Sequence, residues 1–256
     1  MRLRPKKYDE IDFDSVESSE LARKILREKK PLRDIYVETY REMMTVKERY
    51  LAKGGTIVEI GSGGGFIKEI FPDIITSDVK QLEGIDKVFT AEKLPFPDNS
   101  VSAIFALHVL HHIPDITQFL REAERVLVPG GGIVCVEPYW SPVAKFIYKH
   151  VHFEPYDERA PDWLIESGRP GTSSNQAMSY LLMKRDKEKF EKMFPDLQLV
   201  YQRRFGFIRY MATGGIWVGP FLPGFAYTIL KYIEWVLHPL MPLLAISHIF
   251  VWKKVS

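Results

Sequence analysis

The sequence predicts one α/β domain built around a mostly parallel β-sheet. Apolar, β-branched runs at 56–60 and 101–106 are typical of strands buried on both faces of such a sheet. Between the strands lie segments with helical apolar spacing, such as residues 116–127. The first strand leads directly into a glycine-rich turn at 61–65, which is typical of strand-to-helix turns that bind nucleotide-like ligands.

The glycine-rich turn indicates the type of ligand. Glycine lacks a Cβ atom, so the peptide N–H groups of the turn can approach a ligand closely. We expect the residues from Phe66 onward to begin a helix whose N-terminus favours an anion. A dinucleotide-binding turn needs glycine or alanine at the position of Phe66, which disfavours NAD and FAD. Glu59, two residues before Gly61, could receive a cationic group such as the ammonium of an amino acid.

Further segments extend this pattern along the chain. Asp78 ends a second apolar run seventeen residues after Gly61, about the spacing at which an acidic residue contacts a ribose diol. The predicted strand at 101–106 precedes the histidine-rich segment LHVLHH. The helix at 116–127 precedes a Pro-Gly-Gly stop and another buried strand that ends near Pro138.

In this order, the segments resemble the motifs of the class I S-adenosylmethionine (SAM) methyltransferases over residues 57–138. The resemblance implies a Rossmann-like, seven-stranded sheet with an antiparallel last strand, SAM as the cofactor, and methyltransferase activity. The chain departs from the family at Thr90, where an acidic residue often holds the adenine amino group; a hydroxyl accepts that hydrogen bond more weakly. The resemblance implies these cofactor-binding residues: Glu59, Gly61, Ser62, Gly63, Gly65, Asp78, Val79, Thr90, Ala91, Glu92, Leu107 and His108.

Histidine and glutamate side chains are the candidates for a general base. We predict His112, His152 and Glu154 as catalytic residues, the first after the fourth strand and the others in the later HVHFEPYDE segment. The alternatives are that the histidines of LHVLHH only position the cofactor or pack, and that His152 and Glu154 lie in an exposed loop. We predict no metal site, because the H-x-H-x-E string at 150–154 is a weak pattern and no carboxylate pair follows the fourth strand.

The remaining segments are predicted to cover or extend the sheet. In the resembling family, helices before the first strand cover the cofactor, and we expect Tyr36 or Tyr40 to do so here; packing on the sheet edge is the alternative. Residues 139–179 lack regular periodicity and are rich in aromatic residues, which favours a substrate lid. The predicted division is a helical cap at 1–54 with an exposed lead-in to about 17, a cofactor-binding core at 55–138, a substrate lid at 139–185, the end of the sheet at 186–207 and 245–254, and an apolar helical insertion at 208–244.

The apolar insertion is the least determined of these segments. Phe225, Ile229, Tyr232, Ile233 and Val236 share one helical face, and Lys231 and Glu234 interrupt the apolar run, so it is not a membrane span. The face could contact a membrane surface through residues 221–244, cover an apolar substrate pocket, or pack on the core or on a second subunit in a homodimer.

Composition narrows the function further. The net charge of +2 predicts no nucleic-acid partner, and the single cysteine, Cys135, lies in an apolar run that suits a reducing compartment. The basic start runs into acidic residues without an apolar signal segment, so we expect a cytoplasmic protein that could be peripheral to a membrane. The predicted function is methyl transfer from SAM, at oxygen, to a small, amphipathic or lipid-like acceptor. The alternative is a binding or scaffold protein that keeps the fold without turnover.

Overall fold

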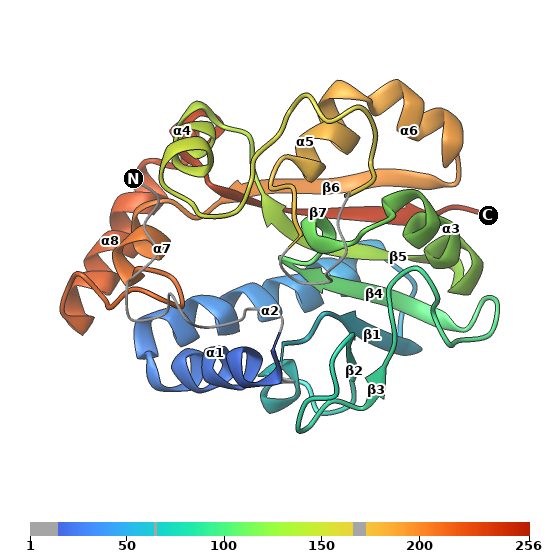
Figure 1. Ribbon diagram of the computed structural model, residues 1–256, viewed down its shortest axis with the longest axis horizontal. Helices are drawn as coiled ribbons and strands as arrows, with labels where there is room; N and C mark the ends of the chain where they lie inside the picture. The colour runs from blue at the N-terminus through green and yellow to red at the C-terminus, as the bar shows by residue number, and fades with distance from the viewer. Residues whose placement is uncertain (1–14, 64–65, 166–172) are drawn as a thin grey trace.

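The computed structural model describes residues 15–63, 66–165 and 173–256, which fold around one seven-stranded sheet (Figure 1). The strand order is β3-β2-β1-β4-β5-β7-β6, and β7 is antiparallel to both of its neighbours while the other pairs are parallel. This confirms the predicted fold class. The strands are β1 Thr56–Ile60, β2 Ile75–Asp78, β3 Lys87–Val88, β4 Val101–Leu107, β5 Leu127–Pro138, β6 Leu197–Phe205 and β7 Ser247–Lys254.

Helices cover both faces of the sheet because the central strands are apolar on both sides. In β4, Ala103 and Phe105 pack in the cluster that holds Tyr40 and Met43 of α2 (Lys30–Tyr50). The intervening Ile104 and Ala106 pack in the cluster that holds α3 (Ile116–Val126) and α6 (Lys187–Met193). In Figure 1, α1 (Val16–Glu28) and α2 lie on one side of the sheet and α5 and α6 on the other.

The helix that we expected after the glycine-rich turn does not form among the described residues. The structure contains only a 3-10 turn, η2 (Phe66–Glu69), because the chain meets Pro72 within one further turn and the residue before proline avoids the helical conformation. Phe66 is 3% exposed, and its ring packs against those of Tyr36 and Tyr40 at 6.3 and 5.7 Å between centroids. The bulky residue at this position therefore anchors α2 over the turn.

The predicted lid contains more regular structure than its sequence indicated. Helix α4 (Pro142–His150) begins at the Ser141 N-cap, whose hydroxyl accepts a hydrogen bond from the Ala144 N–H at 3.0 Å. Later come α5 (Met178–Tyr180) and the π-helical turn η4 (Leu181–Arg185), which packs on the core. The Ser-Pro pair was the available signal for α4.

Two strands differ slightly from their predicted bounds. Strand β5 begins at Leu127, directly after α3, so the Pro-Gly-Gly segment belongs to the strand and forms an irregularity opposite Val101 and Ala103. Strand β7 begins at Ser247 rather than at 245.

The apolar insertion forms α7 (Ile208–Thr213), α8 (Gly224–Val236), η5 (His238–Leu240) and α9 (Met241–Leu244). The predicted apolar face of α8 points outward, since Phe225 and Tyr232 are 72% and 69% exposed. Packing of this face on the core is therefore not what the fold shows. Within the described ranges, none of the helices combines the length and apolar character needed to cross a bilayer.

Candidate active site

The predicted cofactor residues lie at the carboxyl ends of neighbouring strands. Glu59 belongs to β1, Asp78 ends β2, Leu107 ends β4 and His108 follows it. Because β2, β1 and β4 are adjacent and parallel, these residues meet at one edge of the sheet, where the strand order reverses. Ligands bind at this edge in open α/β sheets.

Glu59 is a buried carboxylate with an unused acceptor. Its side chain is 1% exposed, and Oε2 has no hydrogen-bond partner among the described residues. Burial raises the pKa of Glu59 to about 7, against the opposing effect of the Ser62 and Tyr40 hydroxyls and with a small further rise caused by Asp78. A cationic ligand group would therefore be held here by a carboxylate that currently lacks a counter-charge.

The turn after β1 is tied to the end of β2. Gly61 has φ of +61°, and a Cβ atom there would lie 2.5 Å from Val109 Cγ2. The N–H groups of Ser62 and Gly63 donate to the Ser77 carbonyl at 2.8 Å and to Asp78 Oδ2 at 3.1 Å. The turn thus needs glycine for both conformation and space. Gly64 and the predicted ligand Gly65 lie outside the described residues.

The other predicted cofactor residues surround this edge. Val79 and Thr90 are exposed, Ala91 is buried, and Glu92 Oε1 accepts a hydrogen bond from the Asp115 N–H at 3.4 Å. The carboxylate of Glu92 therefore connects the loop after β3 to the start of α3. Direct cofactor contact by these residues remains a prediction.

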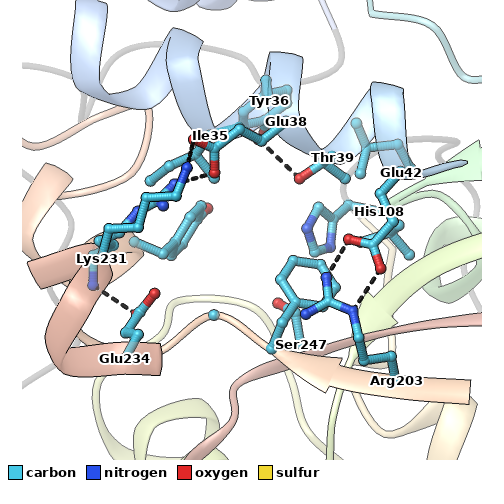
Figure 2. Close-up of a pocket in the computed structure, with 16 residues that line it drawn as sticks. Ile35, Tyr36, Glu38, Thr39, Glu42, His108, Arg203, Lys231, Glu234 and Ser247 are labelled. Atoms are coloured by element: carbon cyan, nitrogen blue, oxygen red, sulfur yellow. Dashed lines mark hydrogen bonds and ion pairs between the residues drawn. The ribbon is translucent and has the colours of Figure 1, made fainter. Parts of the chain in front are cut away.

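His108 connects the cofactor edge to a cavity of about 230 Å³ (Figure 2). It has φ of +57°, an uncommon conformation for a residue with a side chain, and its N–H donates to the Val136 carbonyl at 2.8 Å. Burial lowers the pKa of His108 to about 4, so its imidazole is neutral near pH 7. A neutral imidazole facing a cavity can accept a proton or a hydrogen bond.

The cavity lies between α2, the ends of β4 and β6, and the apolar insertion, and five of its charged residues form ion pairs. Arg203 donates to Glu42 through two nitrogens, one of them Nε at 2.5 Å from Oε1. Arg209 and Lys231 both reach Glu38, at 2.6 and 2.9 Å. Sequence reasoning missed these pairs because the partners are more than 160 positions apart. The cavity is lined by Ile35, Tyr36, Glu38, Thr39, Glu42, Leu107, His108, Val136, Arg203, Phe205, Gly206, Arg209, Tyr210, Lys231, Glu234 and Ser247.

A second cavity, of about 800 Å³, adjoins the first. Glu38, Arg209 and Lys231 line both cavities, so their ion pairs form the partition. The outer cavity is also lined by Phe225, Tyr232 and Trp235 of α8. A polar inner chamber and an outer groove with aromatic walls therefore share one wall.

The predicted catalytic residues only partly come together. Nε2 of His112 lies 3.7 Å from Glu154 Oε1, and Nε2 of His111 lies 3.6 Å from Glu154 Oε2. His152 is not part of this contact; its Nδ1 accepts a hydrogen bond from the Glu154 N–H at 3.2 Å, and its ring stacks on Phe153. Glu154 and His152 are partly buried rather than in an exposed loop.

Glu137 was missed by the sequence analysis. Its carboxylate is fully buried at the end of β5, accepts from the N–H groups of Val109 and Leu110 at 2.9 and 2.8 Å, and contacts His111 Nδ1 at 2.5 Å. Burial works against the charge of His111, but Glu137 and Glu154 outweigh it and raise the pKa of His111 to about 10. An acidic residue at the end of a buried strand, as at Glu59, was the available signal.

Comparison with known proteins matches this arrangement. The model of the methyltransferase domain family matches residues 58–135, which hold most of β1, the glycine turn, β4 and most of β5. Over these residues the chain is similar to the class I SAM-dependent methyltransferases. A demethylmenaquinone methyltransferase of Listeria welshimeri is 31% identical over 138 residues, which cover 49% of this chain and 50% of that protein.

Other matches to the chain are shorter or more distant. The ubiquinone/menaquinone biosynthesis C-methyltransferase UbiE of Desulfotalea psychrophila is 40% identical over 72 residues, covering 28% of this chain and 29% of the relative. A chain from the complex of the Haloferax volcanii Trm112 methyltransferase activator with the putative methyltransferase shares the fold, with a TM-score of 0.50, 15% identity, and coverage of 93% of this chain and 98% of that one. The chain spans about half the length, or less, of the curated relatives that it matches.

The residues at this edge of the sheet fit SAM. The unused Oε2 of Glu59 would accept a hydrogen bond from the ammonium of the methionine part, and Asp78, at the end of β2, would accept those of the ribose hydroxyls. The space beside Gly63, where a Cβ atom would meet nothing within 4 Å, leaves room for a ligand to approach the turn. Tyr36 and Tyr40 pack on Phe66, and their contact with a bound cofactor stays a prediction.

Proposed function

We propose that the protein transfers the methyl group of SAM to a carbon atom of a small amphipathic acceptor bound in the two adjoining cavities. The observation that carries this proposal is the position of His108. Ile60, which precedes the glycine turn, pairs with Ala106, and the next residues of β4, Leu107 and His108, line the inner cavity. The cofactor edge and the cavity therefore meet at one place, as transfer between two bound molecules requires.

Bound SAM supplies an electrophilic methyl group on its sulfonium sulfur. The protein's part is to hold the two molecules in line, to exclude water and to accept a proton. Glu59 and Asp78 hold the cofactor ends. The ring of Tyr36, which lines the cavity and packs on Phe66, covers the cofactor side from water. The neutral imidazole of His108 accepts a hydrogen bond from an acceptor hydroxyl, which increases the electron density of the adjoining ring carbons. After the transfer, the hydrogen on the methylated ring carbon leaves as a proton, which restores the aromatic ring.

Carbon is proposed in place of the oxygen expected from sequence. The curated relatives carry the names demethylmenaquinone methyltransferase and C-methyltransferase, and these names favour a ring carbon as the methyl acceptor. The inner cavity, at about 230 Å³, lies just below the range of about 300–1,000 Å³ that is common for ligand pockets. It suits the reacting ring of an acceptor and not an entire large molecule.

The amphipathic character of the acceptor follows from the outer cavity. An apolar tail that leaves the inner chamber past Glu38, Arg209 and Lys231 would lie against Phe225, Tyr232 and Trp235. Trp235 is 77% exposed, so a tail would remove a large apolar area from water, at about 25 cal/mol per Å². This use of the insertion, as the wall of an acceptor site, is the proposed choice among the lid, membrane and dimer alternatives.

The experiment is a transfer assay with methyl-labelled SAM. The acceptors are a naphthoquinol with an apolar tail, the same quinol without a tail, and a tailed compound without a ring hydroxyl. We expect label in the tailed quinol, bound to carbon by NMR, lower turnover without the tail, and none without the hydroxyl. Asp78→Ala serves as the cofactor-deficient control. Label attached to oxygen, or equal turnover with and without the tail, would contradict the corresponding part of the proposal.

A further inference from the structure

His111, His112 and Glu154 form a cluster of metal-ligand type that lies beside the acceptor cavity. They come from two segments, one after β4 and one after α4, and their nearest ligand-type atoms all lie within 4.8 Å of one another. Tetrahedral ligands at about 2.0–2.1 Å from zinc are separated by about 3.3–3.4 Å. The distances of 3.6 and 3.7 Å from the histidine Nε2 atoms to the Glu154 oxygens are close to that separation.

The hydrogen bonds behind the histidines direct one nitrogen of each ring toward the cluster. Nδ1 of His111 contacts the buried Glu137 carboxylate, and Nδ1 of His112 lies 3.3 Å from the Ser173 carbonyl. Both partners are acceptors, so each Nδ1 can carry a proton. An ion that binds displaces the proton of His111 Nε2, and both Nε2 atoms then present a lone pair on the side of Glu154. Histidines that bind metals are usually held in this way, by a carboxylate or a backbone carbonyl on the other nitrogen.

The third ligand is held as well. The side-chain amide of Gln176 donates to Glu154 Oε2, and the Glu154 N–H donates to His152 Nδ1. The side chains of His112 and Glu154 retain 25% and 16% exposure, which leaves a path for an ion. Glu137, behind His111, accepts hydrogen bonds from two backbone N–H groups, which fix the direction of its carboxylate.

We propose that Nε2 of His111, Nε2 of His112 and one carboxylate oxygen of Glu154 bind a divalent transition-metal ion, of which zinc suits the ligands best. Two imidazoles and one carboxylate are a ligand set of zinc sites that keep one coordination position for water or another oxygen ligand. The rings of His108 and His111 are 6.4 Å apart, so the ion lies next to the histidine that lines the inner cavity. The proposal assigns His112 and Glu154 to metal binding, in place of the proton transfer expected from sequence, and does not depend on methyl transfer.

The test is metal titration of the full chain after treatment with a chelator, without SAM. Co²⁺ serves as the probe for coordination through its visible absorption, and Zn²⁺ competes with it and with a chromogenic chelator. We expect one equivalent of either ion in the wild type, with intense four-coordinate Co²⁺ bands, and a higher melting temperature with Zn²⁺.

Two variants remove ligands, and one exposed histidine supplies the control. His112→Ala and Glu154→Gln should each weaken Zn²⁺ binding at least tenfold and lose the Zn²⁺-dependent rise in melting temperature. Glu137→Gln, which changes only the support behind His111, should weaken binding about 10–100-fold. His150→Ala, on the exposed end of α4, should titrate like the wild type. Far-UV circular dichroism of the metal-free variants identifies any that fail to fold, and Glu154→Gln then stands in for His112→Ala. Wild-type protein that binds no stoichiometric Zn²⁺, or ligand variants that titrate like His150→Ala, would overturn the proposal.

Discussion

The Glu59→Gln variant tests whether the carboxylate of Glu59 binds the ammonium group of the cofactor. The pKa of Glu59 is about 7 because the carboxylate is buried, and its Oε2 atom accepts no hydrogen bond from the described residues. A cationic group bound there favours the ionised carboxylate, so the bound form has a lower pKa than the free protein. Affinity for the cofactor product S-adenosylhomocysteine, which keeps the ammonium, should therefore rise as the pH increases through 7 and then level off.

The size of the effect follows from the fraction of ionised carboxylate. With a pKa of about 7, roughly one molecule in ten is ionised at pH 6 and roughly nine in ten at pH 8. The wild type should thus bind about tenfold more tightly at pH 8 than at pH 6, or about 1.4 kcal/mol. Glu59→Gln keeps the shape without the charge. It should bind about 1.5–3 kcal/mol more weakly than the wild type at pH 8, as for other charged hydrogen bonds, with a smaller gap at pH 6.

The same group sets a pH dependence of stability in the free protein. The folded pKa of about 7 exceeds the ordinary value of 4.5, so the folded state holds a proton that the unfolded state releases in this window. The free energy of unfolding contributed by Glu59 is therefore complete below pH 4.5 and falls as the pH rises through 7, by about 3 kcal/mol in all. Glu59→Gln should be more stable than the wild type at pH 8 and nearly equal at pH 4.5.

Both effects can be measured on the same pair of proteins. Calorimetric titration with S-adenosylhomocysteine at pH 6, 7 and 8 gives the affinities, and urea unfolding at pH 4.5 and 8 gives the stabilities. The difference between wild type and variant removes the contribution of all other titrating groups. Parallel affinity profiles for the two proteins would refute the argument that Glu59 receives the cationic group.

Three further predictions concern the turn, the ribose contact and the acceptor. Asp78→Ala should weaken S-adenosylhomocysteine binding by about 1.5–3 kcal/mol in the same calorimetry, whereas Asp73→Ala, in the exposed loop before β2, should not change it. Gly61→Ala should abolish detectable binding and lower the melting temperature, because its Cβ meets Val109 at a positive φ; normal binding would show that the turn adapts. Tyr232→Ala should raise the KM for a tailed acceptor in steady-state assays and leave that for the tail-less analogue unchanged, and equal effects on both would place the tail elsewhere.

Apolar periodicity and turn residues in the sequence predicted the helices, strands and turns that are determined by interactions between neighbouring residues. Helix α6 and strand β6 fall within residues 186–207, the range predicted for this part of the sheet, because apolar periodicity and the intervening turn residues specify them within a few positions. The glycine turn, Glu59 and Asp78 were found because strand ends and glycine conformation have local signatures. The prediction of a helix from Phe66 onward was wrong for an equally local reason, because Pro72 prevents the chain from continuing as a helix.

Contacts between residues that are far apart in the sequence could not be predicted from local patterns. The ion pairs of Glu38 and Glu42 join α2 to residues more than 160 positions away, and no periodicity encodes such contacts. The face of α8 was correctly identified as apolar, but the pattern of one helix does not say whether that face points to the core or away from it. The assembly of His111 with Glu137 and Glu154 likewise requires three segments to meet.

The central claim, a SAM-binding site at the edge formed by β1, β2 and β4, is tested most directly by calorimetric titration of the purified protein with SAM, S-adenosylhomocysteine and NAD⁺ in parallel. We expect binding of the first two and no binding of NAD⁺, because Glu59 accepts the ammonium and Phe66 occupies the position at which a dinucleotide needs glycine. Binding of NAD⁺ alone, or of none of the three, would contradict the assignment of the site.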